Sequence, residues 1–217
     1  DMEKFEKEKK VILEEIKMYH DNPRYAVNEQ IEKNLFEKPF GELVIGNKES
    51  VSDLKRDFVA KYFKGVYNPE HYIVTLVGDA DFSKVCKYLE DNLSFAGNNI
   101  QMKKIIMKNQ GGVEERAGID QAHFVFAMHA PLPNEREFTV LEVLDAYLAN
   151  GMSSRLFLEI REKRGLAYSI SSSLNAEKNY SFYSIYVGAI KEALSEIKKI
   201  ILKEFSKVSE MNEKDLK

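Results

Sequence analysis

The sequence has little cysteine, no strong excess of one charge sign and no long apolar run. Cys86 is the only cysteine among 217 residues, so an internal disulfide is excluded. It lies at an apolar position of a predicted helix, which indicates a buried, unreactive thiol. No apolar run approaches 18 residues and the chain does not start with a signal-peptide pattern, so no membrane span is predicted. A single cysteine is compatible with a reducing compartment, and we expect a cytoplasmic protein.

The charges are nearly balanced along the chain. There are 35 acidic and 32 basic residues, which give a net charge of −3, and no segment concentrates basic side chains. Binding to nucleic acid or to an anionic membrane surface is therefore not predicted. Hydrophobic residues make up 44% of the chain, and the mean hydropathy is −0.40. This composition is typical of a globular protein whose core suffices for one large domain or two small ones.

Hydrophobic periodicity predicts a mixture of helices and strands. In the first part of the chain it predicts helices over residues 4–20 and 24–35, and a third helix through Phe63 capped by Ser50 or Ser52. Residues 71–78 are rich in β-branched and aromatic side chains and predict a buried strand. The later elements are a helix after Asp79 or Asp81, a strand over 119–130, a helix capped by Asn134, a short helix over 152–164, strands over 167–175 and 181–188, and a helix over 190–208.

Both ends of the chain lie within helical patterns. The sequence begins with Asp1 inside the first of these patterns and ends in the polar stretch SEMNEKDLK. We therefore expect it to be an excised part of a longer protein.

Glu8 and Glu15 form a spaced pair within the opening segment EKEKKVILEEI. Seven residues correspond to two helical turns, so both side chains lie on one helix face. By spacing alone, two glutamates in a charged segment are typical of a solvated face. Glu14 points about 100° away from Glu15 on a helix, so only one of the two can serve a given site.

The segments around this pair carry a family resemblance. EKEKKVILEEI, PRYAVNEQI, KPFGELVIGNKESV and YNPEHYIVTLVGDAD together resemble the pitrilysin/insulinase family of zinc metallopeptidases (inverzincins), and in particular bacterial homologues of mitochondrial processing peptidase. The resemblance covers nearly the whole chain. It implies an α+β fold, in which an antiparallel sheet is backed by helices in a domain that occurs twice per protein.

This resemblance also predicts the domain organisation. Residues 1–95 resemble the C-terminal half of the metal-bearing domain, and residues 113–217 resemble the N-terminal half of the second domain, which binds no metal. Residues 96–112 are rich in Asn, Lys, Gly and Gln and form the predicted linker. Whether the two halves combine into one composite domain is left open.

The resemblance makes Glu15 a zinc ligand and gives Glu8 a supporting catalytic role, orienting ligands or moving protons. In the family, two histidine ligands and a catalytic glutamate come from a His-x-x-Glu-His motif earlier in the chain. This sequence contains no such motif. Among its histidines, His123 and His129 share a strand face but lie about 20 Å apart, too far to share one ion. We expect zinc in the parent protein and none bound by this chain alone.

A second family signature is SSRLFLEIREKRGLAYSISS, residues 153–172. In the family an arginine and a tyrosine seven positions apart reach the bound peptide, and the resemblance places them at Arg161 and Tyr168. A guanidinium can donate two hydrogen bonds to a carbonyl, and a tyrosine hydroxyl can stabilise a developing oxyanion. Composition alone favours a surface arginine and a packing aromatic. The resemblance further implies that substrate adds as an extended strand to an exposed sheet edge.

Together these features predict a fragment of a zinc metalloendopeptidase, or processing peptidase, that hydrolyses extended peptides in a two-domain chamber and is inactive in isolation. The alternative is a non-catalytic peptidase-like subunit used for substrate binding or assembly, although retention of all four site residues favours the enzyme. A generic α+β interaction module remains only if the resemblance is accidental. The expected partners are peptide or unfolded protein substrates and, for assembly, a second copy or a paralogous subunit.

Overall fold

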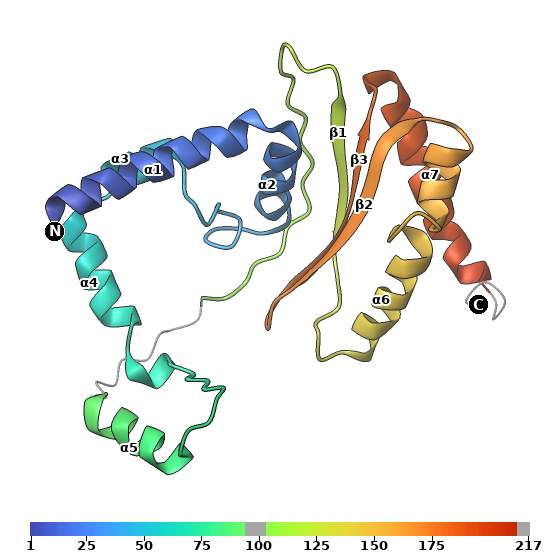
Figure 1. Ribbon diagram of the computed structural model, residues 1–217. Helices are drawn as coiled ribbons and strands as arrows, with labels where there is room; N and C mark the ends of the chain where they lie inside the picture. Colours follow the sequence, from blue (N-terminus) through green and yellow to red (C-terminus); the bar gives the residue numbers. More distant parts are fainter. Residues whose placement is uncertain (94–102, 212–217) are drawn as a thin grey trace. The chain divides into compact units, whose positions relative to one another are not determined.

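A computed structural model of the chain describes residues 1–93 and 103–211 (Figure 1). The contacts group into two units. The first unit comprises Asp1–Glu14 and Asn47–Lys104, and the second comprises Glu15–Gly46 and Ile105–Lys217. Residues 96–102 of the predicted linker lie outside the described residues. The predicted division into two half-domains stays a prediction. No described helix is both long and apolar enough to cross a lipid bilayer.

The chain opens with two helices separated by a proline. Helix α1 (Met2–Asp21) runs unbroken through the predicted range and contains no buried residue. Helix α2 (Pro23–Leu35) begins at the proline, where the missing N–H leaves no backbone donor unsatisfied. The side-chain oxygen of Asn22 accepts hydrogen bonds from the N–H groups of Arg24 and Tyr25 and so caps α2.

The first unit contains short helices with few buried residues. They are α3 (Lys48–Asp53), α4 (Arg56–Val66), the 3₁₀ turn η1 (Pro69–His71) and α5 (Phe82–Asn92). The predicted serine caps are wrong, because Asn47 caps α3 in a reciprocal capping box with Ser50 and the helix breaks before α4. For α5, the structure selects Asp81, whose carboxylate accepts from the N–H of Lys84.

The predicted strand over residues 71–78 is also wrong for this structure. His71 ends η1, and residues 72–77 have no regular secondary structure and are exposed. A strand requires a neighbouring strand for its backbone N–H and C=O groups. Within the described part of the chain none pairs with this segment, so its β-branched composition alone does not produce a strand.

The second unit is built on a three-stranded antiparallel sheet of order β1-β3-β2. Its strands are β1 (Ala122–His129), β2 (Ala167–Ala176) and β3 (Ser181–Ala189), close to the predicted ranges. Every residue of β3 is buried, as expected for a central strand covered on both faces. Because β2 and β3 form a hairpin, their register places Ser171 opposite Tyr186 and Ser173 opposite Ser184.

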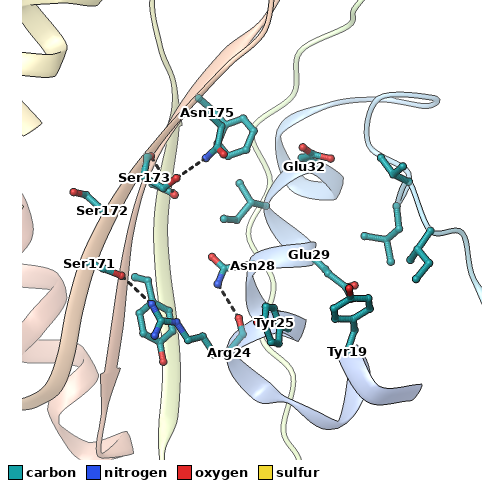
Figure 2. Close-up of a pocket in the computed structure, with 17 residues that line it drawn as sticks. Tyr19, Arg24, Tyr25, Asn28, Glu29, Glu32, Ser171, Ser172, Ser173 and Asn175 are labelled. Carbon is teal, nitrogen blue, oxygen red and sulfur yellow. Dashed lines mark hydrogen bonds between the residues drawn. The ribbon is translucent and has the colours of Figure 1, made fainter. Parts of the chain in front are cut away.

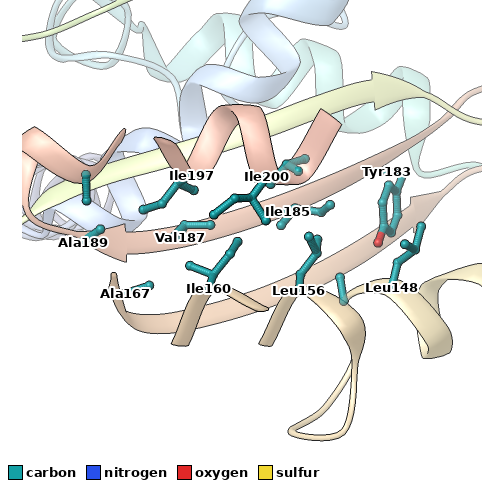
Figure 3. Close-up of a cluster of buried hydrophobic side chains, with 13 residues drawn as sticks. Leu148, Leu156, Ile160, Ala167, Tyr183, Ile185, Val187, Ala189, Ile197 and Ile200 are labelled. Atoms are coloured by element: carbon teal, nitrogen blue, oxygen red, sulfur yellow. The ribbon is translucent and has the colours of Figure 1, made fainter. Parts of the chain in front are cut away.

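One face of this sheet carries the main hydrophobic core (Figure 3). Helix α6 (Arg136–Leu148), the π-helical turn η2 (Phe157–Glu162), the 3₁₀ turn η3 (Lys191–Ala193) and helix α7 (Leu194–Ser206) pack on it, and the 3₁₀ turn η4 (Lys207–Glu210) follows. The core side chains include Leu156, Ile160, Tyr183, Ile185, Val187, Ile197 and Ile201, each fully buried. Helix α6 starts one residue later than its predicted cap Asn134 allows, with Glu135 in the cap position.

Helix α2 covers the opposite face of the sheet. Ile31, Leu35 and Phe36 form a second buried cluster with Phe182 of β3, and Val125 and Ala127 of β1 pack against it. Backbone hydrogen bonds from the second half of the predicted linker join this layer, including Lys108 N–H to the carbonyl of Leu35, 2.8 Å. This small cluster fixes the position of α2 above the sheet. Next to the cluster, an open space remains between α2 and the sheet.

Candidate functional site

The predicted metal residues lie on α1. Glu8 and Glu15 are both exposed, and the helix that carries them is continuous between them. Since Glu8 lies in the first unit and Glu15 in the second, each is described by itself. Neither position contradicts the predicted roles, which stay predictions.

The residues present do not complete a zinc site. Across residues 1–93 and 103–211, no group of three or more His, Cys, Asp or Glu lies close enough together to hold a metal ion. Two of the four histidines bond within the second unit: His123 Nδ1 lies 2.8 Å from the Tyr186 hydroxyl and His129 Nε2 lies 2.9 Å from the carbonyl oxygen of Lys108. One carboxylate cannot supply the three protein ligands of a catalytic zinc site. The donor set found here therefore does not fit the metal by itself.

The predicted substrate residues flank the turn between η2 and β2. Arg161 lies in η2, with its guanidinium 5.0 Å from the ring centre of Phe157. Gly165 has φ 62°, a left-handed conformation that ends the helical turn. Tyr168 follows at a register irregularity of β2, and 58% of its surface is exposed. Both side chains are exposed, and their contact with a substrate stays a prediction.

Glu159, two positions before Arg161, has a strongly lowered pKa. Its two oxygens contact Lys163 and Arg164, the latter at 2.6 Å. These hydrogen bonds to two cations stabilise the charged form and lower the pKa of Glu159 to about 2. The ion pairs join η2 to the turn that leads into β2.

A pocket of about 700 Å³ with both polar and apolar lining residues lies within the second unit, between α2 and the sheet (Figure 2). Arg24, Tyr25, Asn28, Glu29 and Glu32 line it from α2, Tyr19 lines it from the end of α1, and Leu43, Val44 and Ile45 line it from the following loop. The sheet contributes Ser171, Ser172, Ser173 and Asn175 of β2, together with Phe182, Ser184 and Tyr186 of β3.

The cationic end of this pocket is formed by Arg24. Its guanidinium stacks 4.5 Å from the ring centre of Tyr186 and donates a hydrogen bond to the Ser171 hydroxyl at 3.3 Å. Burial, with a smaller contribution from the Arg24 charge, lowers the pKa of neighbouring His123. Within the described residues, no carboxylate pairs with Arg24.

The acidic end lies farther along α2. Partial burial raises the pKa values of Glu29 and Glu32, and the charge of Glu177 adds to the rise at Glu32. In the described part of the chain neither Glu29 nor Glu32 forms an ion pair. Figure 2 shows Arg24 and Ser171 at one end of the pocket, with Glu32 and Asn175 at the other.

The sequence-based interpretation missed this pocket, although two patterns pointed to it. Arg24, Asn28 and Glu32 recur every four residues and make a polar stripe along α2. Ser171, Ser173 and Asn175 alternate along β2 and so share one face. Only the packing of α2 on the sheet brings the two stripes opposite each other.

Comparison with known proteins decides the family. The profile described as "Peptidase M16 inactive domain" matches residues 53–217. The chain belongs to the M16 peptidase family. The membership confirms the resemblance to the pitrilysin-type metallopeptidases.

Curated relatives of the M16 chain are named as zinc proteases. This chain is 28% identical over 214 residues to an uncharacterized zinc protease of Streptomyces coelicolor, and the match covers 94% of this chain and 47% of the relative. It is 30% identical over 204 residues to an uncharacterized zinc protease of Mycobacterium leprae, covering 90% and 46%. The chain therefore spans about half the length of the curated relatives that it matches.

Solved structures confirm the α+β fold. A protease from Helicobacter pylori superposes with a TM-score of 0.82 at 23% identity, covering 99% of this chain and 55% of that one. A chain of complex III from Candida albicans superposes with a TM-score of 0.81 at 16% identity, covering 97% and 53%. At these identities the likeness concerns the fold alone.

Proposed function

We propose that this chain is part of an M16 zinc metalloendopeptidase that hydrolyses extended peptides in a chamber formed by two domains. The observation that carries the proposal is its family membership together with relatives named zinc proteases that are about twice as long. In the parent protein Glu15 binds the zinc ion and Glu8 supports the metal ligands, while Arg161 and Tyr168 contact the peptide.

The structure supports the substrate roles through exposure and local geometry. Tyr168 is more than half exposed at the start of an edge strand, and Arg161 precedes it across a turn fixed by Gly165. A guanidinium and a phenol at these positions can donate hydrogen bonds to peptide carbonyl oxygens. Because the described residues supply one of the three expected ligands, no catalytic step through the metal is assigned to this chain.

A test of the enzyme proposal compares metal content and activity in the full-length parent protein. We expect stoichiometric zinc and cleavage of an internally quenched fluorescent peptide. Glu15→Gln removes both zinc and cleavage, whereas the neighbouring Glu14→Gln retains them. Glu8→Gln lowers metal affinity or activity by about 10–100-fold. Full-length protein without zinc, or equal behaviour of the Glu14 and Glu15 variants, would contradict the proposal.

The 217-residue chain by itself is expected to bind no zinc tightly and to cleave no peptide. A single carboxylate leaves the metal with too few protein ligands. Metal analysis after dialysis against zinc, with the full-length protein as positive control, checks this. Stoichiometric zinc retained by the isolated chain would show that other residues complete the site.

A second candidate function is a non-catalytic subunit, since the matching family is described as an inactive domain. Such a subunit would bind peptides or join an assembly with a second copy or a paralogous partner. The same zinc measurement on the parent protein separates the two functions, because a non-catalytic subunit lacks the metal. Size-exclusion chromatography with light scattering then shows whether it forms a homodimer.

A further inference from the structure

The pocket between α2 and β2 has opposite charges at its two ends. Arg24 forms one end and has no acidic partner among the described residues. Glu32 forms the other end and has no basic partner there, whereas Glu29 lies near the positive charges of His20 and Arg116. Glu177 adds negative charge near Glu32. A half-buried pocket with unpaired charges of opposite sign at its ends complements a ligand with the reverse arrangement.

The middle of the pocket matches a peptide backbone. The Ser173 hydroxyl and the Asn28 amide lie between the charged ends, with Ser171 next to Arg24 and Asn175 towards Glu32 (Figure 2). These groups can both donate and accept hydrogen bonds, as the alternating N–H and C=O groups of a peptide require. Tyr25, Ile31 and Val44 add apolar lining that can contact side chains.

The length of the pocket fits three or four residues. Arg24 and Glu32 are eight positions apart on α2, which corresponds to about 12 Å along the helix axis. An extended chain advances about 3.3 Å per residue, so a tetrapeptide spans a similar distance.

We propose that this pocket binds a short peptide in one direction, with its C-terminal carboxylate at Arg24 and its N-terminal ammonium group at Glu32. The choice of a peptide rests on the proposed peptidase function, whereas the charge complementarity rests on the pocket alone. The site would recognise the free ends of short peptides, the class of molecule that an endopeptidase releases.

The test is an NMR titration of the isotope-labelled 217-residue chain with tetra-alanine in four forms: free at both ends, N-acetylated, C-amidated and blocked at both ends. We expect the free peptide to shift the amide signals of Ser171, Ser173 and Asn28. Each block is expected to weaken binding about tenfold, because it removes one charged contact.

Variants assign each end of the peptide to its residue. Arg24→Gln should weaken binding of the free and N-acetylated peptides about tenfold but leave the C-amidated peptide unchanged. Glu32→Gln should affect only peptides with a free amino end. Arg24→Lys retains the charge and should restore part of the affinity. Lys33→Gln, an exposed charge change on the same helix, is the matched control and should have no effect.

Equal binding of all four peptides, shifts confined to other parts of the chain, or no binding of free tetra-alanine would overturn the inference. These results leave the proposed function intact if the full-length parent still cleaves the quenched peptide. End-dependent binding to this chain combined with a zinc-free, inactive parent would retain the pocket as a peptide site and reject the peptidase.

Discussion

At the scale of single residues, Tyr183 and Asp145 form a buried polar pair in the core of the second unit. The Tyr183 hydroxyl donates a 2.8 Å hydrogen bond to the Asp145 carboxylate, and both residues are buried. Burial and the neighbouring carboxylate raise the pKa of Tyr183 far above its usual range, so the phenol stays protonated and remains a donor. The pair ties α6 to the central strand β3.

Tyr183→Phe should therefore destabilise the chain. It leaves the Asp145 carboxylate buried with one donor fewer, which costs about 1–3 kcal/mol in the free energy of unfolding. Urea denaturation followed by circular dichroism measures the change. Tyr88→Phe, at a 66% exposed position on α5, serves as the control and should change stability little. An unchanged midpoint for Tyr183→Phe would mean that Asp145 finds another donor.

Glu159 gives a prediction on acid stability. Its pKa falls from 4.5 to about 2 on folding, so its contribution is complete above pH 4.5 and is lost as the pH falls towards 2. Glu159→Gln should lower the free energy of unfolding by about 1 kcal/mol at pH 7, a value typical of ion pairs near the surface. Denaturation at pH 7, 4 and 2 should show the difference shrinking towards zero, while Glu162→Gln changes little at any pH. A difference independent of pH would assign the effect to packing.

At the scale of elements, the turn between η2 and β2 positions the two predicted substrate residues. Gly165 adopts φ 62° there, and a Cβ added to it would meet no atom within 4 Å. The cost of a side chain at this position is therefore conformational and not a matter of space.

Gly165→Ala is expected to reduce the free energy of unfolding by about 1 kcal/mol, the penalty of a left-handed conformation with a Cβ. Gly65→Ala is the matched comparison, because Gly65 lies inside α4 with equally open surroundings and no positive φ. There alanine should stabilise by up to about 1 kcal/mol, since it restricts the unfolded chain. Urea denaturation of both variants measures the two changes in the free energy of unfolding, which should have opposite signs. Two changes of the same sign would contradict this account of the turn.

At the scale of the whole molecule, the two units differ in how much they bury. In the described part of the first unit, Val51 and Asn68 are the only buried residues. Many of its large apolar side chains are exposed, among them Phe58, Ile73, Val77 and Phe82. The second unit contains both hydrophobic clusters and the sheet. Its structure is stabilised by burial that the first unit lacks.

Hydrogen exchange should show this difference. We expect slow exchange for the amides of β3 and α7 and fast exchange for those of α3, α4 and α5, because local opening of the first unit exposes little additional apolar surface. Mass spectrometry of peptic fragments resolves the two groups. Comparable protection in both units would mean that the first unit is stabilised by contacts beyond its own packing.

The sequence by itself determined the features that depend on neighbouring residues. Asn22 and Pro23 end α1 and start α2, Gly165 ends η2, and the alternation in β2 and β3 places the hairpin. The cap of α3 was predicted wrongly. Asn47 takes the cap position and Ser50 completes a reciprocal capping box with it, so neither Ser50 nor Ser52 caps the helix. The resemblance to the family could also be found from short segments of the sequence, because each motif is a set of residues at fixed positions along the chain.

Only the tertiary structure decided the features that join distant segments. Residues 72–77 have the composition of a strand yet form none, because a strand depends on a partner that lies elsewhere in sequence. The pocket has the same origin: Arg24 and Ser171 are 147 positions apart, and the packing of α2 on the sheet brings them together. Charge and hydrogen-bonding capacity belong to each residue, but complementarity to a ligand arises from the distance between residues, which the fold sets.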